Sequence, residues 1–280
     1  MNSKQERIEI FEGTHKLYLN NKALKKSVEN SINNQKIYWE GEKITVGEPV
    51  FSEPFNLVVS TKKTVEAARK YADAGKKVCI LNFASSVAPG GGVLTGEQAQ
   101  EESICRVSTL YFSLSDKNTA GRFYDRHWEL IRVGKMNRRN TEDIIYTPGV
   151  IVVRDDADNE KFLEEKDWYQ VDAVTCAAPD IRKIGDHTEY SPKKEELYKE
   201  FVKRWKLILS AGAKHKAEVL ILGAFGCGVF ANPPEMVAEA FSEAAKDFEN
   251  YFETIEFAIY GPKEKNTNYQ EFEKILNNGK

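Results

Sequence analysis

The chain has 280 residues, of which 40 are basic and 43 acidic, so its formal net charge is −3. This length is enough for one large α/β domain or two small ones, and without a linker rich in Pro, Gly or Ser we predict a single globular unit. Because basic residues are not in excess, we expect no general nucleic-acid binding, and a polyanionic ligand would need a local site.

The four cysteines, Cys79, Cys105, Cys176 and Cys227, occur singly, without a Cys-x-x-Cys pair. This usage fits reduced thiols in a cytoplasm better than a disulfide framework or a zinc site. No apolar stretch approaches the length needed to span a bilayer, and residues 1–12 are charged rather than signal-like. We therefore expect a soluble, intracellular protein of the cytoplasm that does not associate with membranes.

Helical and strand patterns alternate along most of the chain, which is typical of a parallel or mixed sheet covered by helices on both faces. The predicted helices span residues 22–31, 61–74, 195–209, 233–248 and 269–276. The predicted strands span residues 36–39, 78–83, 171–175, 219–222 and 256–260. We therefore predict a three-layer α/β/α fold with a mixed, largely parallel central sheet and an N-terminal helical extension over residues 1–50.

Two glycine-rich segments each follow a predicted buried strand. Gly90-Gly91-Gly92 comes after the strand at 78–83, and a run from Gly223 to Gly228 comes directly after the strand at 219–222. Open α/β sheets bind ligands at the carboxyl ends of their strands. On neighbouring strands, these two loops would form one crevice.

Gln100-Glu101-Glu102 follows the three glycines after an interval of seven residues. Three consecutive glycines lose more conformational entropy on folding than a structural turn requires, but they leave no side chain between a ligand and the backbone. The pattern therefore indicates a ligand loop with a carboxylic acid beside it. The alternative is a solvated pair of charges at the start of a helix.

The second loop leads into a helix at Pro233 and Pro234 and reads Gly223-Ala224-Phe225-Gly226-Cys227-Gly228-Val229-Phe230. Unhindered backbone N–H groups beside a helix N-terminus can hold a pyrophosphate without a basic side chain. The glycine spacing is not that of a Rossmann fingerprint, and the Gly-Lys-Ser/Thr ending of a P-loop is missing. The alternative is a tight turn that packs a helix on a sheet.

These segments together resemble a known family. Gly90-Gly91-Gly92 and Gln100-Glu101-Glu102, with Leu81-Asn82-Phe83-Ala84-Ser85 before them and the 223–230 loop after them, are similar to the signature of the microbial poly(ADP-ribose) glycohydrolases, whose catalytic core is a macrodomain. The resemblance covers residues 50–262 and is weaker in the first fifty residues. It implies a macrodomain-like catalytic domain over residues 51–280, on which residues 1–50 pack as an extension.

The resemblance also implies an activity, the hydrolysis of ribose–ribose O-glycosidic bonds of poly(ADP-ribose) to release ADP-ribose, with no metal or other cofactor and with cleavage of terminal units as the expected mode. Breaking such a bond needs a proton on the leaving oxygen and stabilisation of an oxocarbenium-like transition state. The resemblance assigns the acid and base roles to Glu102, and the binding of ribose hydroxyls to Glu101 and Asn82. With one dominant carboxylate, we expect the diphosphate of the substrate to help stabilise the cation.

The residues predicted to bind substrate come from the strand end and both loops. They are Asn82, Gly90, Gly91, Gly92, Gln100, Gly226, Cys227, Gly228, Val229 and Phe230. Phe230 resembles the aromatic residue that the family stacks on its ligand, and a core phenylalanine is the alternative. Ser85 stands where ordinary macrodomains carry a further asparagine, so a second amide is missing there.

The other polar candidates favour structural interpretations. Surface or structural roles, rather than metal ligation, are predicted for the isolated histidines His15, His127, His187 and His215. A solvated turn, rather than a cation site, is predicted for Asp155, Asp156 and Asp158. A charged loop, rather than a polymer contact, is predicted for Arg132, Lys135, Arg138 and Arg139.

Two other functions stay open at this point. A non-catalytic macrodomain that binds ADP-ribose would need the 223–230 loop but not Glu102. An enzyme with the same acid could instead act on another ADP-ribose conjugate, namely one on a nucleic-acid end, one on an acidic side chain, or O-acetyl-ADP-ribose. The expected partners are poly(ADP-ribose) or ADP-ribose as ligand, and ADP-ribosylated proteins.

Overall fold

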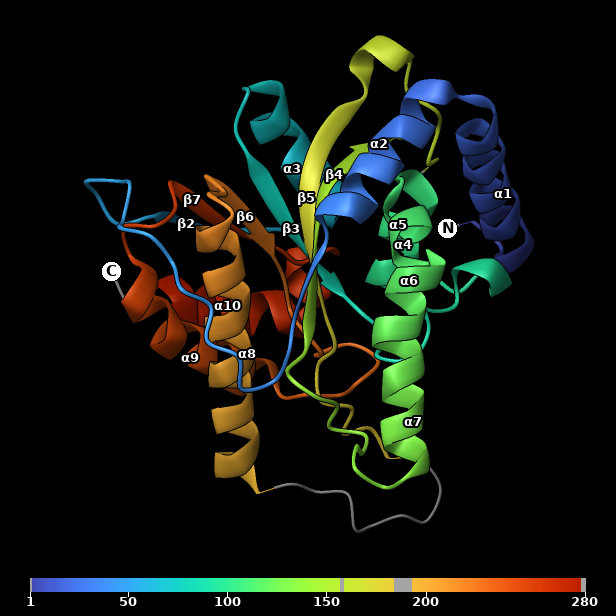
Figure 1. The fold of residues 1–280 in the computed structure, drawn as a ribbon. Coiled ribbons are helices and arrows are strands. Elements are labelled where there is room, and N and C mark those ends of the chain that lie inside the picture. The colour runs from blue at the N-terminus through green and yellow to red at the C-terminus, as the bar shows by residue number, and fades with distance from the viewer. Residues whose placement is uncertain (1, 157–158, 184–192, 278–280) are drawn as a thin grey trace.

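A seven-stranded sheet forms the centre of the molecule, with the strand order β1-β4-β5-β3-β6-β7-β2 (Figure 1). The computed structural model describes residues 2–156, 159–183 and 193–277. The strands are β1 (Lys36–Tyr38), β2 (Asn56–Ser60), β3 (Val78–Phe83), β4 (Ile144–Val152), β5 (Tyr169–Cys176), β6 (Val219–Leu222) and β7 (Thr254–Ala258). β4 runs antiparallel to both of its neighbours, and the remaining pairs are parallel. The sheet is therefore mixed and largely parallel, as predicted.

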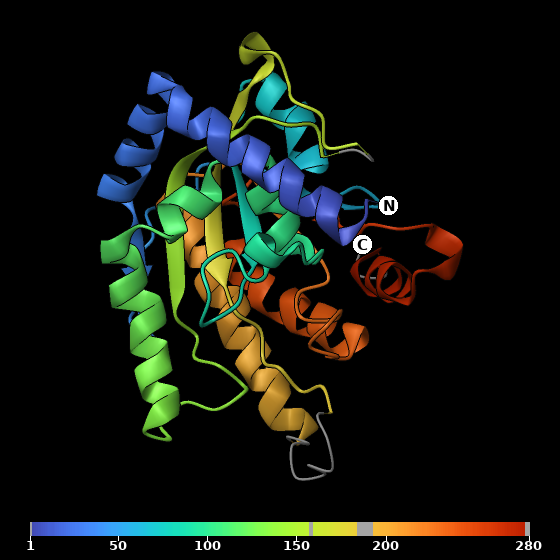
Figure 2. The same cartoon turned by 90° about the vertical axis from the view of Figure 1, so that its right-hand side faces the viewer.

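Helices cover both faces of the sheet and complete the three layers (Figures 1 and 2). They are α1 (Lys4–Asn20), α2 (Lys22–Asn34), α3 (Thr64–Asp73), α4 (Gln100–Val107), α5 (Leu110–Leu114), α6 (Lys117–Ala120), α7 (Arg126–Arg132), α8 (Lys194–Lys214), α9 (Pro234–Ala245) and α10 (Thr267–Asn277). α8, α9 and α10 pack on one face, and α1 to α5 pack on the other, where α6 and α7 continue the layer. This is the α/β/α arrangement that the sequence predicted.

The central strand β3 shows why its sequence is an unbroken apolar run. Cys79 and Leu81 belong to the hydrophobic cluster beneath α8 and α9, whereas Val78 and Ile80 belong to the cluster beneath α3, α4 and α5. Successive side chains of a strand point to opposite faces, so a strand covered on both faces is apolar at every position. β3 and β6 have the predicted bounds, since the sequence signal of such strands is local.

Several elements were not predicted from the sequence, among them α1, α4 to α7, β2 and β4. α1 buries only Phe11 and Thr14 among its 17 residues, so it has almost no apolar stripe to detect. β2 lies at the edge of the sheet beside β7. β4 contains Pro148 and Gly149, two residues that are uncommon inside strands, and they form an irregularity between Thr147 and Val150 within a continuous strand.

The N-terminal residues are joined to the rest of the molecule by specific bonds. β1 pairs with β4 and so adds an edge strand to the sheet. In α1, Arg7 Nε donates to the carbonyl of Gly96 at 2.6 Å, and Thr14 Oγ1 donates to the carbonyl of Arg106, also at 2.6 Å. α1 therefore contacts both the glycine-rich segment and α4, which carry the candidate site.

Within the described ranges, no helix combines the length and the apolar character needed to cross a lipid bilayer.

Candidate active site

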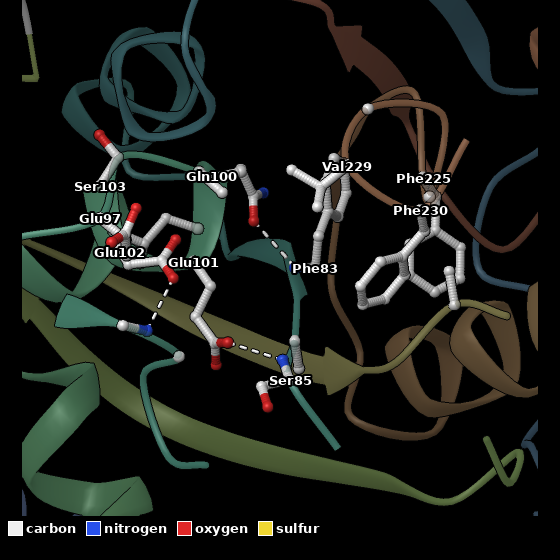
Figure 3. Close-up of a pocket in the computed structure, with 18 of the residues that line it drawn as sticks. Phe83, Ser85, Glu97, Gln100, Glu101, Glu102, Ser103, Phe225, Val229 and Phe230 are labelled. Carbon is white, nitrogen blue, oxygen red and sulfur yellow. Dashed lines mark hydrogen bonds between the residues drawn. The ribbon is translucent and has the colours of Figure 1, made fainter. Parts of the chain in front are cut away.

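Loops at the carboxyl ends of β3, β5 and β6, together with the first turn of α4, surround one cleft of about 1340 Å³. β3 pairs directly with β6, so the two glycine-rich loops meet in this cleft, as predicted. Figure 3 shows Glu101 and Glu102 on one side of the cleft, opposite Val229 and Phe230. The arrangement brings the predicted acid and the predicted anion loop together across one space.

Gln100 fastens the start of α4 to the end of β3. Its Oε1 accepts a hydrogen bond from the Phe83 N–H at 2.8 Å, and its Nε2 donates to the Leu81 carbonyl at 2.7 Å and to Thr64 Oγ1 at 3.0 Å (Figure 3). Although Gln100 lines the cleft, its amide is occupied by protein groups. These bonds fit a residue that positions α4 better than one that binds substrate.

Glu101 is held by donors from β3 and from the loop that follows it. Its Oε1 accepts from Asn82 Nδ2 at 3.1 Å, and its Oε2 accepts from the Ser85 N–H at 2.7 Å. Asn82 Nδ2 also donates to Thr175 Oγ1 at 3.3 Å, while Asn82 Oδ1 is buried and has no partner among the described residues. Both oxygens of Glu101 are therefore used within the protein.

Glu102 uses only one of its two oxygens. Oε1 accepts a hydrogen bond from the Gly92 N–H at 2.8 Å, whereas Oε2 is buried and has no partner in the described part of the chain. Because buried polar atoms are almost always paired, this oxygen marks a place where a ligand group is expected.

The close approach of the backbone at Gly91 explains the glycine at this position. Gly91 has φ of +58°, and a Cβ there would collide with Glu102 Oε1 and would lie 3.1 Å from Glu101 Oε2. A side chain at residue 91 would thus displace both carboxylates. Neighbouring Gly90 and Gly92 complete the loop, with the Gly91 N–H donating to the Ala88 carbonyl at 3.0 Å.

Burial excludes the alternative of a solvated pair of charges. Glu101 is 2% exposed and Glu102 is 7% exposed. Burial, opposed by the hydrogen bonds from Ser85 and Asn82 and aided by the neighbouring charge of Glu102, raises the pKa of Glu101 to about 8. Glu101 therefore keeps its proton at neutral pH.

The loop after β6 is shaped for an anion. Gly226 has φ of +74°, and a Cβ there would lie 2.6 Å from Ala178 Cβ and 2.7 Å from Asn232 Nδ2. Asn232 Nδ2 braces the turn by donating to the carbonyls of Gly226 at 2.9 Å and Pro179 at 2.7 Å. The chain then enters α9 at Pro234, so the loop stands before a helix N-terminus.

Several backbone donors of this loop are unused. Four residues that form it have N–H groups with no acceptor among the described residues: Gly226, Gly228, Val229 and Phe230. All four residues line the cleft. Such a row of backbone donors, close to a helix N-terminus, can bind a pyrophosphate without basic side chains.

The side chains of the loop divide between the core and the cleft. Burial raises the pKa of the Cys227 thiol well above its usual range, which makes this cysteine a packing residue rather than a nucleophile. Phe230 is partly buried against the core and also lines the cleft, so it combines the two roles that the sequence left open. Val229 is exposed at the mouth.

Sequence reasoning missed the residues that brace the loop after β3. His127 is buried, its Nδ1 lies 2.8 Å from the Ser86 carbonyl, and its Nε2 lies 2.8 Å from Asp143 Oδ2. Asn140 accepts from Ser86 Oγ at 2.7 Å and donates to the Ala178 carbonyl, also at 2.7 Å. His127 is therefore structural, one of the roles predicted for it, and it acts on the loop that supplies Ser85 to Glu101.

The prediction of a solvated turn is wrong for Asp156. This residue is buried at the rim of the cleft, accepts from Ser103 Oγ at 2.9 Å, and lies 3.6 Å from Lys63 Nζ. Burial raises its pKa to about 7. No local sequence pattern indicates this burial, because the partners come from α4 and from the loop before α3. Among the described residues, no group of three His, Cys, Asp or Glu side chains could hold a metal ion.

Ion pairs hold two arginines of the charged segment that follows α7. Arg138 pairs with Asp180 at 2.9 Å, and Arg139 lies 3.4 Å from Glu196. Two further candidates, Asp158 and His187, lie outside the described residues.

Comparison with known proteins adds independent information. A family model described as the catalytic domain of microbial-type PARG matches residues 5–155. This match includes the first fifty residues, where the resemblance seen in the sequence is weaker, and ends before the 223–230 loop. A search of curated proteins returned no match.

Solved structures cover the remainder of the chain. Poly(ADP-ribose) glycohydrolase from Thermomonospora curvata is 30% identical and superposes with a TM-score of 0.84 over 97% of this chain and 99% of that one. The same enzyme bound to the inhibitor ADP-HPD is 30% identical, with a TM-score of 0.79 over 96% and 99%. The Deinococcus radiodurans enzyme in complex with ADP-ribose is 26% identical, with a TM-score of 0.73 over 90% and 97%.

Proposed function

This chain belongs to the microbial-type poly(ADP-ribose) glycohydrolase family, and from that premise we propose that it is a glycosidase that hydrolyses ribose–ribose O-glycosidic bonds of poly(ADP-ribose) and releases ADP-ribose. One observation carries the proposal. The buried Oε2 of Glu102 lies in the same cleft as the N–H groups of Gly226, Gly228, Val229 and Phe230, and none of these five groups has a partner in the described part of the chain. A binding module needs only the second of these features.

Glu102 is the proposed general acid and base. Its Oε1 is fixed by the Gly92 N–H, which leaves Oε2 for the leaving oxygen of the scissile bond. After the bond breaks, the same carboxylate takes a proton from water as that water attacks the sugar. A single group can perform both steps if the incoming water takes the place of the leaving alcohol on the same face of the ribose.

The proton for the first step is held on the neighbour of Glu102. Burial raises the pKa of Glu101 to about 8, so this carboxyl group holds a proton at neutral pH. A bound diphosphate would add negative charge nearby, which favours retention of that proton. Both oxygens of Glu101 already accept hydrogen bonds within the protein, whereas Glu102 Oε2 has no partner among the described residues, so Glu102 is the proposed contact through which a proton reaches the ligand.

Glu101 and Asn82 are the proposed contacts for the hydroxyls of the reacting ribose. Asn82 Oδ1 has no partner among the described residues and can accept from a hydroxyl. The diphosphate would occupy the 226–230 loop, with Phe230 packing on the ligand. No second carboxylate is assigned as a nucleophile, so the substrate's own diphosphate is the proposed stabiliser of the oxocarbenium-like cation.

The natural substrate and the cellular location belong to the same proposal. Polymer attached to ADP-ribosylated proteins is the proposed natural substrate, and the cytoplasm is the proposed location. The four free thiols support a reducing compartment.

Two other functions can be distinguished by substrate. A reader of ADP-ribose would bind the ligand and release nothing from the polymer. A hydrolase of another conjugate would release ADP-ribose from a nucleic-acid end, an acidic side chain or the O-acetyl ester, but not from poly(ADP-ribose). Offering these substrates to one preparation separates the three cases.

The decisive experiment compares the parent protein with Glu102→Gln, using chromatography of the ADP-ribose released from poly(ADP-ribose). We expect the rate to fall at least about a hundredfold, as for loss of a general acid, while the affinity for ADP-ribose changes little. Glu97→Gln is the matched control, because Glu97 also lines the cleft but is exposed and pairs with Lys4. Equal rates for the parent and Glu102→Gln would refute the assignment.

A further inference from the structure

An exposed tryptophan stands beside the cleft on α7. Trp128 is 55% exposed, and its Nε1 donates to the carbonyl of Val87 at 3.0 Å. The hydrogen bond fixes the orientation of the indole, and more than half of the side chain remains exposed to solvent. A large aromatic surface that is oriented and solvent-exposed is a ready stacking platform.

This platform is continuous with the candidate active site. Val87 lines the cleft, as does Ile131, which lies one helical turn after Trp128 and is 39% exposed. The next residue, Ala88, accepts the Gly91 N–H, and the neighbouring Gly92 N–H holds Glu102. A short stretch of one loop therefore joins the tryptophan to the proposed acid.

The order of the strands gives the direction in which a polymer must run. β6, which carries the proposed diphosphate loop, lies between β7 and β3. On the β7 side the cleft is lined by Ile259 and Tyr260, and on the β3 side it is lined by Val87 and Ile131. With the reacting ribose at Glu102, beyond the end of β3, and the diphosphate at the loop after β6, the adenosine would point toward β7 and the leaving unit would continue on the β3 side, toward α7.

The charge of this surface suits a second diphosphate. Arg132 lies one turn after Trp128 on α7, and Lys135 follows just beyond the end of the helix; both are exposed. Arg132 pairs with Glu129 at 2.6 Å, whereas Lys135 makes no ion pair with any described residue. The platform thus combines an aromatic face with an available cation.

We propose that Trp128 and the adjoining face of α7 form a subsite for the adenosine diphosphate part of the leaving unit, with the adenine stacked on the indole. The proposal rests on the proposed function, since it takes poly(ADP-ribose) as the substrate. The leaving hydroxyl belongs to the adenosine ribose of the next unit, so an adenine lies directly beyond the scissile bond. The subsite would make the protein prefer polymer over free ADP-ribose.

The test measures binding in the Glu102→Gln background, so that the ligand stays intact. The probes are ADP-ribose and the purified dimer of two ADP-ribose units. We expect the dimer to bind about tenfold more tightly than ADP-ribose, and Trp128→Ala to remove this advantage without changing the affinity for ADP-ribose. Leu19→Ala, an exposed apolar residue of α1, is the control and should change neither affinity.

Trp128→Phe separates stacking from the hydrogen bond to Val87. The phenyl ring keeps an aromatic face but has no N–H, so most of the dimer's advantage should persist. The proposal is overturned if the dimer binds no more tightly than ADP-ribose, if Trp128→Ala leaves the advantage intact, or if Trp128→Phe loses as much as Trp128→Ala. Release of ADP-ribose from polymer by the parent reports separately on the proposed function.

Discussion

Glu101 and Glu102 are adjacent on α4, yet only Glu102 has an oxygen without a partner in the described part of the chain. Both oxygens of Glu101 accept from Ser85 and Asn82, whereas Glu102 accepts only from Gly92. Consecutive residues of a helix point in directions about 100° apart, so two adjacent carboxylates meet different donors. The difference in hydrogen bonding is what assigns the two residues different proposed roles.

The raised pKa of Glu101 predicts a pH-dependent stability. Its pKa is about 8 in the fold, against an ordinary value of 4.5, so the protonated form favours folding. This contribution is complete below about pH 4.5 and is lost as the pH rises through about 8. Glu101→Gln should abolish this pH-dependent loss of stability, because a glutamine side chain does not ionise. The new amide can be accommodated, since Asn82 Oδ1 can accept a hydrogen bond from it after a flip of the Asn82 side chain.

Urea unfolding of the parent and Glu101→Gln at pH 5 and pH 8.5 checks this prediction. The variant should gain stability relative to the parent at the higher pH, by on the order of a few kcal/mol. Asp156 also has a raised pKa but is present in both proteins, so its effect cancels in the comparison. If the unfolding free energies of the variant and the parent differed by the same amount at both pH values, the pKa of Glu101 would not be raised in the fold.

Two glycines of the second loop should respond differently to a methyl group. In Gly226→Ala the new Cβ collides with Ala178 at a backbone with positive φ, so we expect a loss of about 1–3 kcal/mol of stability together with weaker binding of ADP-ribose. In Gly228→Ala no described atom lies within 4 Å of the new Cβ. Stability should therefore stay within about 0.5 kcal/mol.

Binding distinguishes the two substitutions. Because Gly228 lines the cleft and has an unused N–H, the Gly228→Ala methyl group should hinder the diphosphate and weaken ADP-ribose binding about tenfold, which corresponds to one charge-assisted hydrogen bond. Thermal unfolding and titration calorimetry on each variant give the two quantities. Parent-like affinity in Gly228→Ala would place the diphosphate elsewhere.

His127 should contribute strongly to stability although it lies outside the catalytic pair. His127→Ala removes the donor to the Ser86 carbonyl and leaves the buried Asp143 without its ring partner, which we expect to cost about 2–4 kcal/mol. His15→Ala is the control, because His15 is exposed on α1. Equal midpoints for both variants in chemical denaturation would contradict this account.

Thr14 tests how firmly α1 is joined to α4. Its hydroxyl donates to the Arg106 carbonyl and accepts from Arg154 Nε at 2.8 Å, so Thr14→Val leaves two buried groups unpaired. We expect a loss of about 1–3 kcal/mol. Thr14→Ser keeps the hydroxyl and should retain most of the stability in the same denaturation measurement. A Thr14→Val variant as stable as Thr14→Ser would show that the hydrogen bonds of the hydroxyl do not hold α1 to α4.

The first and last turns of several elements show where sequence reasoning was incomplete. α8 (Lys194–Lys214) extends past the predicted 195–209, and β7 (Thr254–Ala258) begins two residues before the predicted 256–260. β4 was missed because Pro148 and Gly149 are uncommon inside strands, and only pairing with β5 on both sides of the irregularity holds them in a strand. Such pairing depends on residues distant in the sequence.

The sequence by itself determined the apolar runs of β3 and β6, the glycine loops at their carboxyl ends and the acidic pair after the first loop. These signals are local, because burial on two faces and access to a backbone each constrain a few consecutive residues. Only the tertiary structure decided which oxygen of the pair is free, that His127 braces the loop at Ser86, and that Trp128 stands beside the cleft. Each of these depends on atoms brought together by long-range packing, such as His127 and Ser86, which lie 41 residues apart in the chain.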